Sequence, residues 1–115
     1  MKELNGVPYD KEAETELVCS LLAGPDYLCR IASEIQPKFF LNPELRTVYT
    51  RMLSLVQHDR DVTEINMGDG TDQEFRILLC KLYDNSITGT SAPHWAKKVR
   101  EHAYAREIYK LGEQL

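Results

Sequence analysis

The 115-residue sequence lacks any run of about 20 apolar residues, the length that a helix needs to cross a bilayer. Its longest apolar stretches are interrupted by charged residues every few positions, so we expect no membrane span. Residues 1–6 also lack the apolar centre of a secretory signal. These absences predict a cytoplasmic protein that has no membrane partner.

Cysteine is scarce, and its spacing gives no pattern. Cys19, Cys29 and Cys80 are odd in number and contain no C-x-x-C pair, which argues against a disulfide framework and against a thiolate zinc site. Helical spacing places each of the three on an apolar face, where a free cysteine behaves as a small hydrophobic side chain. The sequence therefore predicts three reduced thiols in the core.

Glycine is also sparse, and its one cluster does not form a phosphate-binding loop. Residues 68–70 read Gly-Asp-Gly and are followed by acidic and polar residues, without the lysine and the preceding strand that such a loop requires. Asp59, Asp61 and Thr63 alternate like the start of a calcium loop. Glu64 and Gly70 then stand where an EF-hand needs glycine and glutamate, so we expect a solvated loop.

No arrangement of side chains predicts catalysis. The histidines His58, His94 and His102 have no partner at a metal-ligand spacing. Alternate positions on a helix point in different directions, so the glutamates at positions 12, 14 and 16 are interpreted as a solvated face rather than as paired carboxylates. We expect no catalytic residue, no metal site and no cofactor in this chain.

A strong basic face is missing as well. The net charge is −4, with 14 basic and 18 acidic residues, and only residues 93–115 carry a small positive excess. That last segment mixes aromatic and basic side chains, which can bind single-stranded nucleic acid. Its helical spacing, however, places Trp95 on the core side and the basic residues on other faces. We therefore expect no strong direct binding of nucleic acid.

What the sequence does contain is helical periodicity. The clearest apolar stripe comprises Ala13, Leu17, Val18, Leu21 and Leu22, with Asp10 as the expected N-cap. Further helices are expected over residues 26–35, from Pro43 after the cap residue Asn42, around residues 75–82, and from about residue 93 to the end. Residues 57–72 and 85–91 are expected to be loops. The prediction is an all-α fold, a compact orthogonal bundle of about five to six helices in a single domain over residues 1–115.

The order of these elements resembles one protein family. Near the start, Pro8 precedes Glu-Ala-Glu at 12–14 and the apolar segment 17–22; next come two phenylalanines at 39–40, Asn42-Pro43, and the segment 45–49. Asp-Val-Thr at 61–63, the leucines of 78–82, and the closing series Trp95, Val99 and Arg106 follow in the same order. This succession is similar to the N-terminal domain of the DnaB-type bacterial replicative DNA helicases. The sequence departs from the family in having Pro93 in place of the usual asparagine, and in lacking a histidine near residue 45.

The resemblance implies a function in DNA replication. In that family the N-terminal domain forms a collar on a hexameric ring and contacts the primase or a helicase loader. ATP hydrolysis, with its Mg²⁺, belongs to a RecA-like C-terminal domain, which is absent from these residues. The resemblance thus implies a protein-interaction and oligomerisation domain, cut from a larger ATP-dependent helicase, that self-associates as a weak dimer or as part of a hexamer.

Tyrosine is enriched at the energetic centres of protein interfaces, so four tyrosines are the candidate partner-binding residues. They are Tyr27, Tyr83, Tyr104 and Tyr109. Half-buried positions at the edge of the core are an equally good interpretation of each. Two other functions remain open: the helicase-binding domain of a primase, which has a similar helical fold, and a stand-alone helical DNA-binding regulator.

Overall fold

The computed structural model describes residues 3–4, 7–8 and 10–114 of the chain, so the interpretation of residues 1–6 lies largely outside the described residues. The described part forms six α-helices: α1 (Lys11–Ala23), α2 (Leu28–Ala32), α3 (Pro43–Gln57), α4 (Glu64–Gly68), α5 (Gln73–Asp84) and α6 (Ala92–Gln114). Single 3-10 turns, η1 (Pro25–Tyr27) and η2 (Pro37–Phe39), precede α2 and α3. The two-residue strands β1 (Glu3–Leu4) and β2 (Val7–Pro8) pair antiparallel before α1. The all-α fold class is confirmed.

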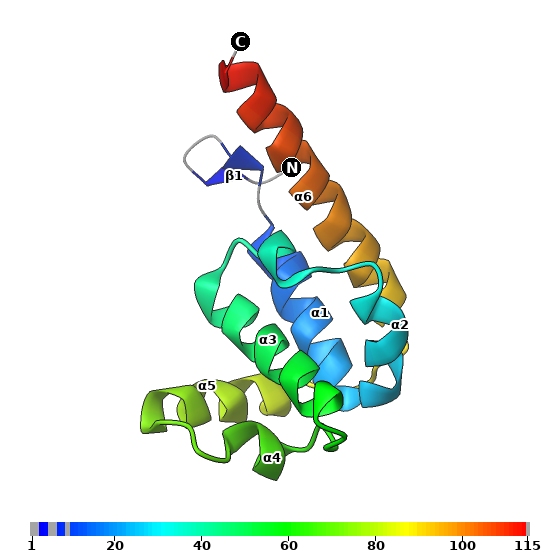
Figure 1. Ribbon diagram of the computed structural model, residues 1–115, viewed down its shortest axis with the longest axis vertical. Coiled ribbons are helices and arrows are strands. Elements are labelled where there is room, and N and C mark those ends of the chain that lie inside the picture. Colours follow the sequence, from blue (N-terminus) through cyan, green and yellow to red (C-terminus); the bar gives the residue numbers. More distant parts are fainter. Residues whose placement is uncertain (1–2, 5–6, 9, 115) are drawn as a thin grey trace.

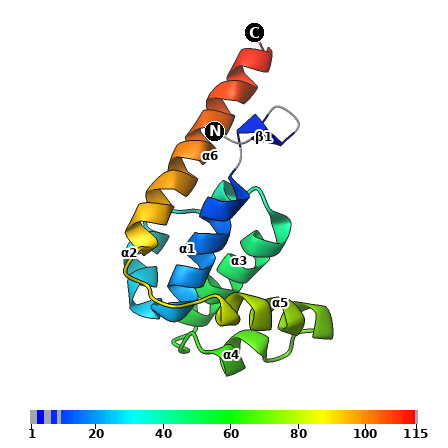
Figure 2. The same ribbon diagram turned by 180° about the vertical axis from the view of Figure 1, so that it is seen from behind.

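Helix α1 lies at the centre of the bundle and contacts α3, α5 and α6 (Figures 1 and 2). Its predicted apolar stripe is fully buried, as expected for a helix that is covered on several sides. Asp10 caps the helix, since its carboxylate accepts a hydrogen bond from the Ala13 amide at 3.2 Å. In the same way the Asn42 side chain accepts from the Leu45 amide at 3.0 Å, with Pro43 in the first turn of α3. Both predicted caps are confirmed.

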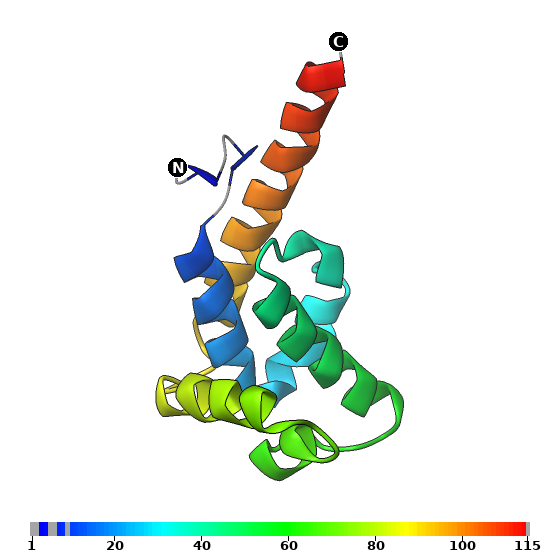
Figure 3. The ribbon, with the colours of Figure 1, turned by 90° about the vertical axis from the view of Figure 1, so that its left-hand side faces the viewer.

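Helix α6 is longer than the bundle that it covers. The molecule measures 47 Å along its longest axis against 28 and 25 Å along the others, and the C-terminal half of α6 accounts for the long axis (Figures 1 and 3). The first half of α6 buries Ala96, Val99 and Ala103 against the bundle. The second half extends beyond the other helices and lies beside the β1–β2 hairpin.

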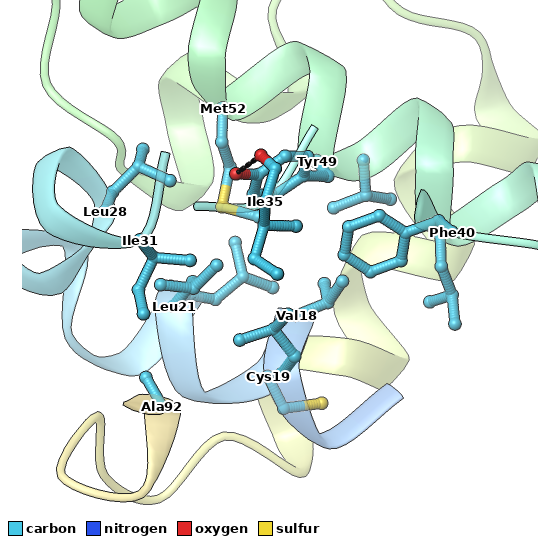
Figure 4. Close-up of a cluster of buried hydrophobic side chains, with 14 of the residues drawn as sticks. Val18, Cys19, Leu21, Leu28, Ile31, Ile35, Phe40, Tyr49, Met52 and Ala92 are labelled. Carbon is cyan, nitrogen blue, oxygen red and sulfur yellow. Dashed lines mark hydrogen bonds between the residues drawn. The ribbon is translucent and has the colours of Figure 1, made fainter. Parts of the chain in front are cut away.

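The core contains a buried tyrosine that α3 contributes (Figure 4). Tyr49 is fully buried, and its hydroxyl donates a hydrogen bond to the Ile35 carbonyl at 2.7 Å. Its ring packs on Phe40, with the ring centroids 4.9 Å apart. Burial raises the pKa of Tyr49 well above its ordinary value. This bond ties the segment after α2 to the middle of α3.

A pair of tyrosine-to-phenylalanine variants tests how much the Tyr49–Ile35 hydrogen bond contributes to stability. We expect Tyr49→Phe to lower the free energy of unfolding by about 1–2 kcal/mol, because the Ile35 carbonyl loses its donor. Tyr83→Phe is the matched control: the Tyr83 hydroxyl is buried and has no hydrogen-bond partner among the described residues. Its removal is expected to be neutral or to stabilise the fold by up to about 1 kcal/mol. Urea titration measures both values, and equal losses in the two variants would contradict this assignment.

Several details of the sequence interpretation are wrong. Part of the expected loop over residues 57–72 forms α4, which the Thr63 hydroxyl caps by accepting from the Asn66 amide at 3.1 Å. This helix was missed because it is a single polar turn that buries only Met67. Of the three cysteines only Cys19 is buried, whereas Cys29 and Cys80 are exposed. The expected helix over 26–35 is divided into η1 and the shorter α2.

Candidate interaction surfaces

The four candidate tyrosines do not form one patch. Tyr27 in η1 and Tyr83 in α5 are half-buried against the core, and burial raises the pKa of Tyr83 to about 12. Tyr104 and Tyr109 lie on α6 with exposed fractions of 53% and 36%. Helix α5 and the end of α6 are at opposite ends of the molecule (Figure 1). The first two tyrosines therefore occupy core-edge positions, and only the pair on α6 presents substantial surface.

The C-terminal half of α6 carries an exposed apolar stripe. Tyr104, Ile108 and Leu111 have exposed fractions of 53%, 70% and 60% and follow the i, i+4, i+7 spacing of one helix face. We call these three residues the α6 stripe. Tyr109 lies about 140° around the helix from Tyr104 and is not part of it. Ile108 and Leu111 are exposed because the other helices of the bundle end before them.

A polar cluster, made of the buried Glu14 and Arg106 and the exposed Arg46, links α1, α3 and α6. We call Glu14, Arg46 and Arg106 the Glu14 cluster. The Glu14 carboxylate is only 2% exposed and accepts hydrogen bonds from the Leu41 and Asn42 amides, each at 3.0 Å. The expectation that Glu14 belongs to a solvated face is therefore wrong, although Glu12 and Glu16 are exposed.

Two arginines complete the Glu14 cluster. Arg106 is 7% exposed and donates to the Phe39 carbonyl, 67 positions earlier in the chain. Arg46 donates through Nε and a terminal nitrogen to the Phe40 carbonyl at 3.0 and 2.7 Å. The two side chains thus hold the carbonyls of Phe39, the last residue of η2, and of Phe40, which follows it, while Glu14 holds the next two amides. The cluster fixes this segment against both α1 and α6.

Opposing influences act on the pKa of Glu14. Burial raises the pKa above 4.5, whereas the two backbone amides and the charges of Arg106 and Arg46 lower it, and burial is the largest contribution. An acid whose folded pKa is raised stabilises the fold fully below its unfolded pKa, and that contribution is lost as the pH rises through the folded pKa.

The sign of this shift gives a prediction for the pH dependence of stability. Compared with Glu14→Gln, the wild-type protein should gain free energy of unfolding as the pH falls from neutrality towards 4.5. Urea titrations of both proteins at a series of pH values measure the difference. A wild-type protein that instead loses stability relative to the variant on acidification would show that the arginines and amides outweigh burial.

A groove lies next to the Glu14 cluster, between α6, η2 and the start of α3. It has a volume of about 540 Å³ and is lined by Lys38, Phe39, Arg46, Tyr104, Arg106 and Lys110, among others. We call it the α6–η2 groove. The sequence interpretation missed it because its walls come from segments far apart in the chain. The one available signal in the sequence was the basic excess of residues 93–115. It did not indicate that Lys38, from a distant segment, lines the same groove.

The residues considered for a calcium or phosphate loop instead form helix ends and a turn. Thr63 caps α4, Gly68 ends that helix, and Gly70 adopts a positive φ of 73° in the turn before α5. Within the described ranges there is no group of three or more histidine, cysteine, aspartate or glutamate side chains that could hold a metal ion. None of the described helices is long and apolar enough to cross a membrane.

Comparison with known proteins places the chain in a family. A family model described as the DnaB-like helicase N terminal domain matches residues 6–101. The crystal structure of the N-terminal domain of DnaB helicase from Mycobacterium tuberculosis has the same fold, with a TM-score of 0.83 and 21% sequence identity over 94% of this chain and 80% of that one. A search of curated proteins found no match.

These findings distinguish between the three interpretations of the sequence. The model that matches describes the N-terminal domain of a helicase, and not the helicase-binding domain of a primase or a DNA-binding regulator. The match covers most of the chain, including all of α1 to α5 and the first part of α6. This chain belongs to the family of DnaB-like helicase N-terminal domains.

Proposed function

We propose that residues 1–115 act as the protein-interaction domain of a replicative DNA helicase. In this proposal the domain contacts a primase or a helicase loader and supports assembly of a hexameric ring in the cytoplasm. ATP hydrolysis, with its Mg²⁺, belongs to a separate C-terminal motor domain outside these residues, and the chain alone turns over no ATP. Family membership and the exposed surface of α6 support the proposal.

The α6 stripe is the observation that carries an interaction function. Contiguous apolar side chains exposed on one helix face are typical of a surface that packs against another protein. Tyr104, Ile108 and Leu111 are each more than half exposed, while α6 buries a different set of side chains against its own bundle. The helix thus has one face for the fold and one that is available to a partner.

The basic side chains of α6 do not support strong nucleic-acid binding by this domain. Arg106 is buried in the Glu14 cluster, and Arg100 pairs with Glu34 at 3.3 Å. Affinity for nucleic acid depends on the number of cations that can reach phosphates. Because two of the five cations of this helix are engaged within the protein, the remaining charge is too dispersed for a strong phosphate-binding face.

A charged substitution in the α6 stripe tests self-association. We expect weak dimerisation of the wild-type chain, and we expect Ile108→Asp combined with Leu111→Asp to weaken the dimer by about tenfold or more, because the carboxylates would be buried at the contact. Ile65→Asp combined with Ile87→Asp is the matched control, since these residues are 83% and 92% exposed and lie outside α6. Sedimentation equilibrium measures the association constants. A stable hexamer of the isolated chain, or equal weakening by the control, would contradict the assignment.

A further inference from the structure

The α6–η2 groove has a wall that is fixed by the Glu14 cluster. Phe39 and Phe40 offer their carbonyls to Arg106 and Arg46, so the backbone between η2 and α3 is held from both sides. Helix α6 contributes Ala103, Tyr104 and Lys110 to the lining and contacts η2 directly. A binding surface whose walls are held by internal hydrogen bonds loses little conformational freedom when a ligand enters.

The groove carries an excess of positive charge. Lys38 and Lys110 stand on its two sides, and Arg46 and Arg106 lie along it, against the single acidic lining residue Glu107. The two arginines are balanced in part by the buried Glu14 carboxylate. Neither lysine forms an ion pair within the described part of the chain. Two lysines therefore line the groove, with Glu107 as the one carboxylate among its lining residues.

The most buried residues that line the groove are two apolar side chains and one arginine. Phe39, Ala103 and Arg106 have exposed fractions of 9%, 6% and 7%, and Leu41 extends the apolar surface. We call Phe39 and Ala103 the apolar floor. Tyr104 stands at the edge, with its ring perpendicular to that of Phe39 at a centroid distance of 5.9 Å. A ligand that fits this floor and its charged rim has an apolar side chain flanked by negative charges.

An acidic protein segment fits these features better than nucleic acid. A polynucleotide needs an extended basic track, whereas this site is a local hollow on a chain whose net charge is −4. Carboxylates separated by an aliphatic side chain can reach both lysines and fill the floor at once.

We propose that the α6–η2 groove binds an acidic, leucine-containing segment of a partner protein. The leucine side chain lies on the Phe39–Ala103 floor, and the flanking carboxylates pair with Lys38 and Lys110. This inference rests on the proposed function, since it names the chemistry of the segment that the interaction domain recognises. It assigns the partner to a site distinct from the α6 stripe residues Ile108 and Leu111.

The probe for the groove is a short synthetic peptide of alternating glutamate and leucine. Its binding to the ¹⁵N-labelled chain is followed by chemical-shift changes. The expected result is saturable binding that moves the amides of Lys38, Phe39, Tyr104 and Lys110, and that weakens as the salt concentration rises. Lys38→Glu combined with Lys110→Glu should weaken binding by about tenfold or more. Both lysines are exposed, so the variant is expected to fold.

Matched controls separate this site from general attraction between charges. Lys81→Glu combined with Lys97→Glu changes the net charge by the same amount at exposed positions outside the groove and should leave the affinity within about twofold. A peptide with glutamine in place of glutamate should not bind. Equal weakening by both double variants, shifts elsewhere on the surface, or tighter binding of a single-stranded DNA oligonucleotide in the groove would overturn the proposal.

The full partners distinguish failure of this inference from failure of the proposed function. A complex with the primase or the loader that Lys38→Glu/Lys110→Glu abolishes supports the groove as the recognition site. A complex that forms equally well with this variant overturns the groove proposal and leaves the interaction function intact. Peptide binding in the groove without any complex with either protein would support the groove and contradict the proposed function.

Discussion

Glu14→Ala is expected to lower the free energy of unfolding by about 2–5 kcal/mol, because two backbone amides lose their acceptor and an unsatisfied buried donor costs about 1–3 kcal/mol. The substitution removes the acceptor of the Leu41 and Asn42 amides. It also removes the negative charge beside Arg106, whose exposed fraction is only 7%. Among the described side chains, Glu14 is the one on α1 that hydrogen-bonds to the residues just before α3. We therefore expect the segment of Leu41 and Asn42 to become more mobile in the variant.

The measurement is urea unfolding of the variant followed by circular dichroism. Glu16→Ala is the matched control, because Glu16 lies on the same helix and is exposed. An exposed substitution of this kind changes stability by no more than about 0.5 kcal/mol. If the Glu14 variant lost less than about 1 kcal/mol, the cluster would contribute no more than an ordinary hydrogen bond.

The second large effect is expected at the contact between two glycines. A Cβ atom added to Gly89 would lie 2.7 Å from the Gly24 Cα and 3.0 Å from the Ser20 carbonyl oxygen. Both neighbours are backbone atoms that cannot rotate away, so the end of α1 and the loop before α6 must separate. We expect Gly89→Ala to cost about 1–3 kcal/mol or more, the usual range for overpacking.

Gly112→Ala provides the comparison for this variant. A Cβ on Gly112 meets no atom within 4 Å, and the residue lies inside α6. Alanine should therefore stabilise the helix by up to about 1 kcal/mol. Thermal unfolding of both variants checks the pair, and a Gly89→Ala protein as stable as the wild type would show that the two loops can move apart without cost.

Local signals in the sequence predicted much of the fold. Asp10, and Asn42 followed by Pro43, fixed the starts of α1 and α3, because capping depends on residues within one turn. The apolar spacing of α1 gave its buried face, since a central helix has a continuous stripe. The short α4 had no such stripe, although Thr63 is a local cap. The apolar spacing of Leu28, Ile31 and Ile35 predicted one continuous helix and gave no sign of the division into η1 and α2.

The burial of Glu14 had a signal that the interpretation of the sequence did not use. Glu14 precedes Val18 and Leu21 at the i+4 and i+7 positions, so it lies on the apolar face of α1 rather than opposite it. An acidic residue on such a face needs partners inside the protein. Those partners are the Leu41 and Asn42 amides, which lie 27 and 28 positions further along the chain and which the sequence alone did not bring to Glu14.

The candidate surfaces were the least predictable feature. The four candidate tyrosines were chosen by residue type alone. Their exposure depends on how far α6 extends past the bundle, and of the four only Tyr104 and Tyr109 lie on that extension. The groove depends on the approach of η2 to α6, which no local pattern indicates. Long-range packing, and not composition, therefore decides which side chains a partner can reach.

The most direct test of an interaction function is to mix the purified chain with the primase and the helicase loader from the same source and to follow each mixture by sedimentation velocity, with ATP turnover measured in parallel. The account predicts that at least one partner co-sediments with the chain and that the chain alone hydrolyses no ATP. ATP turnover by the chain alone, or independent sedimentation of all three proteins at concentrations well above those of a specific complex, would contradict it.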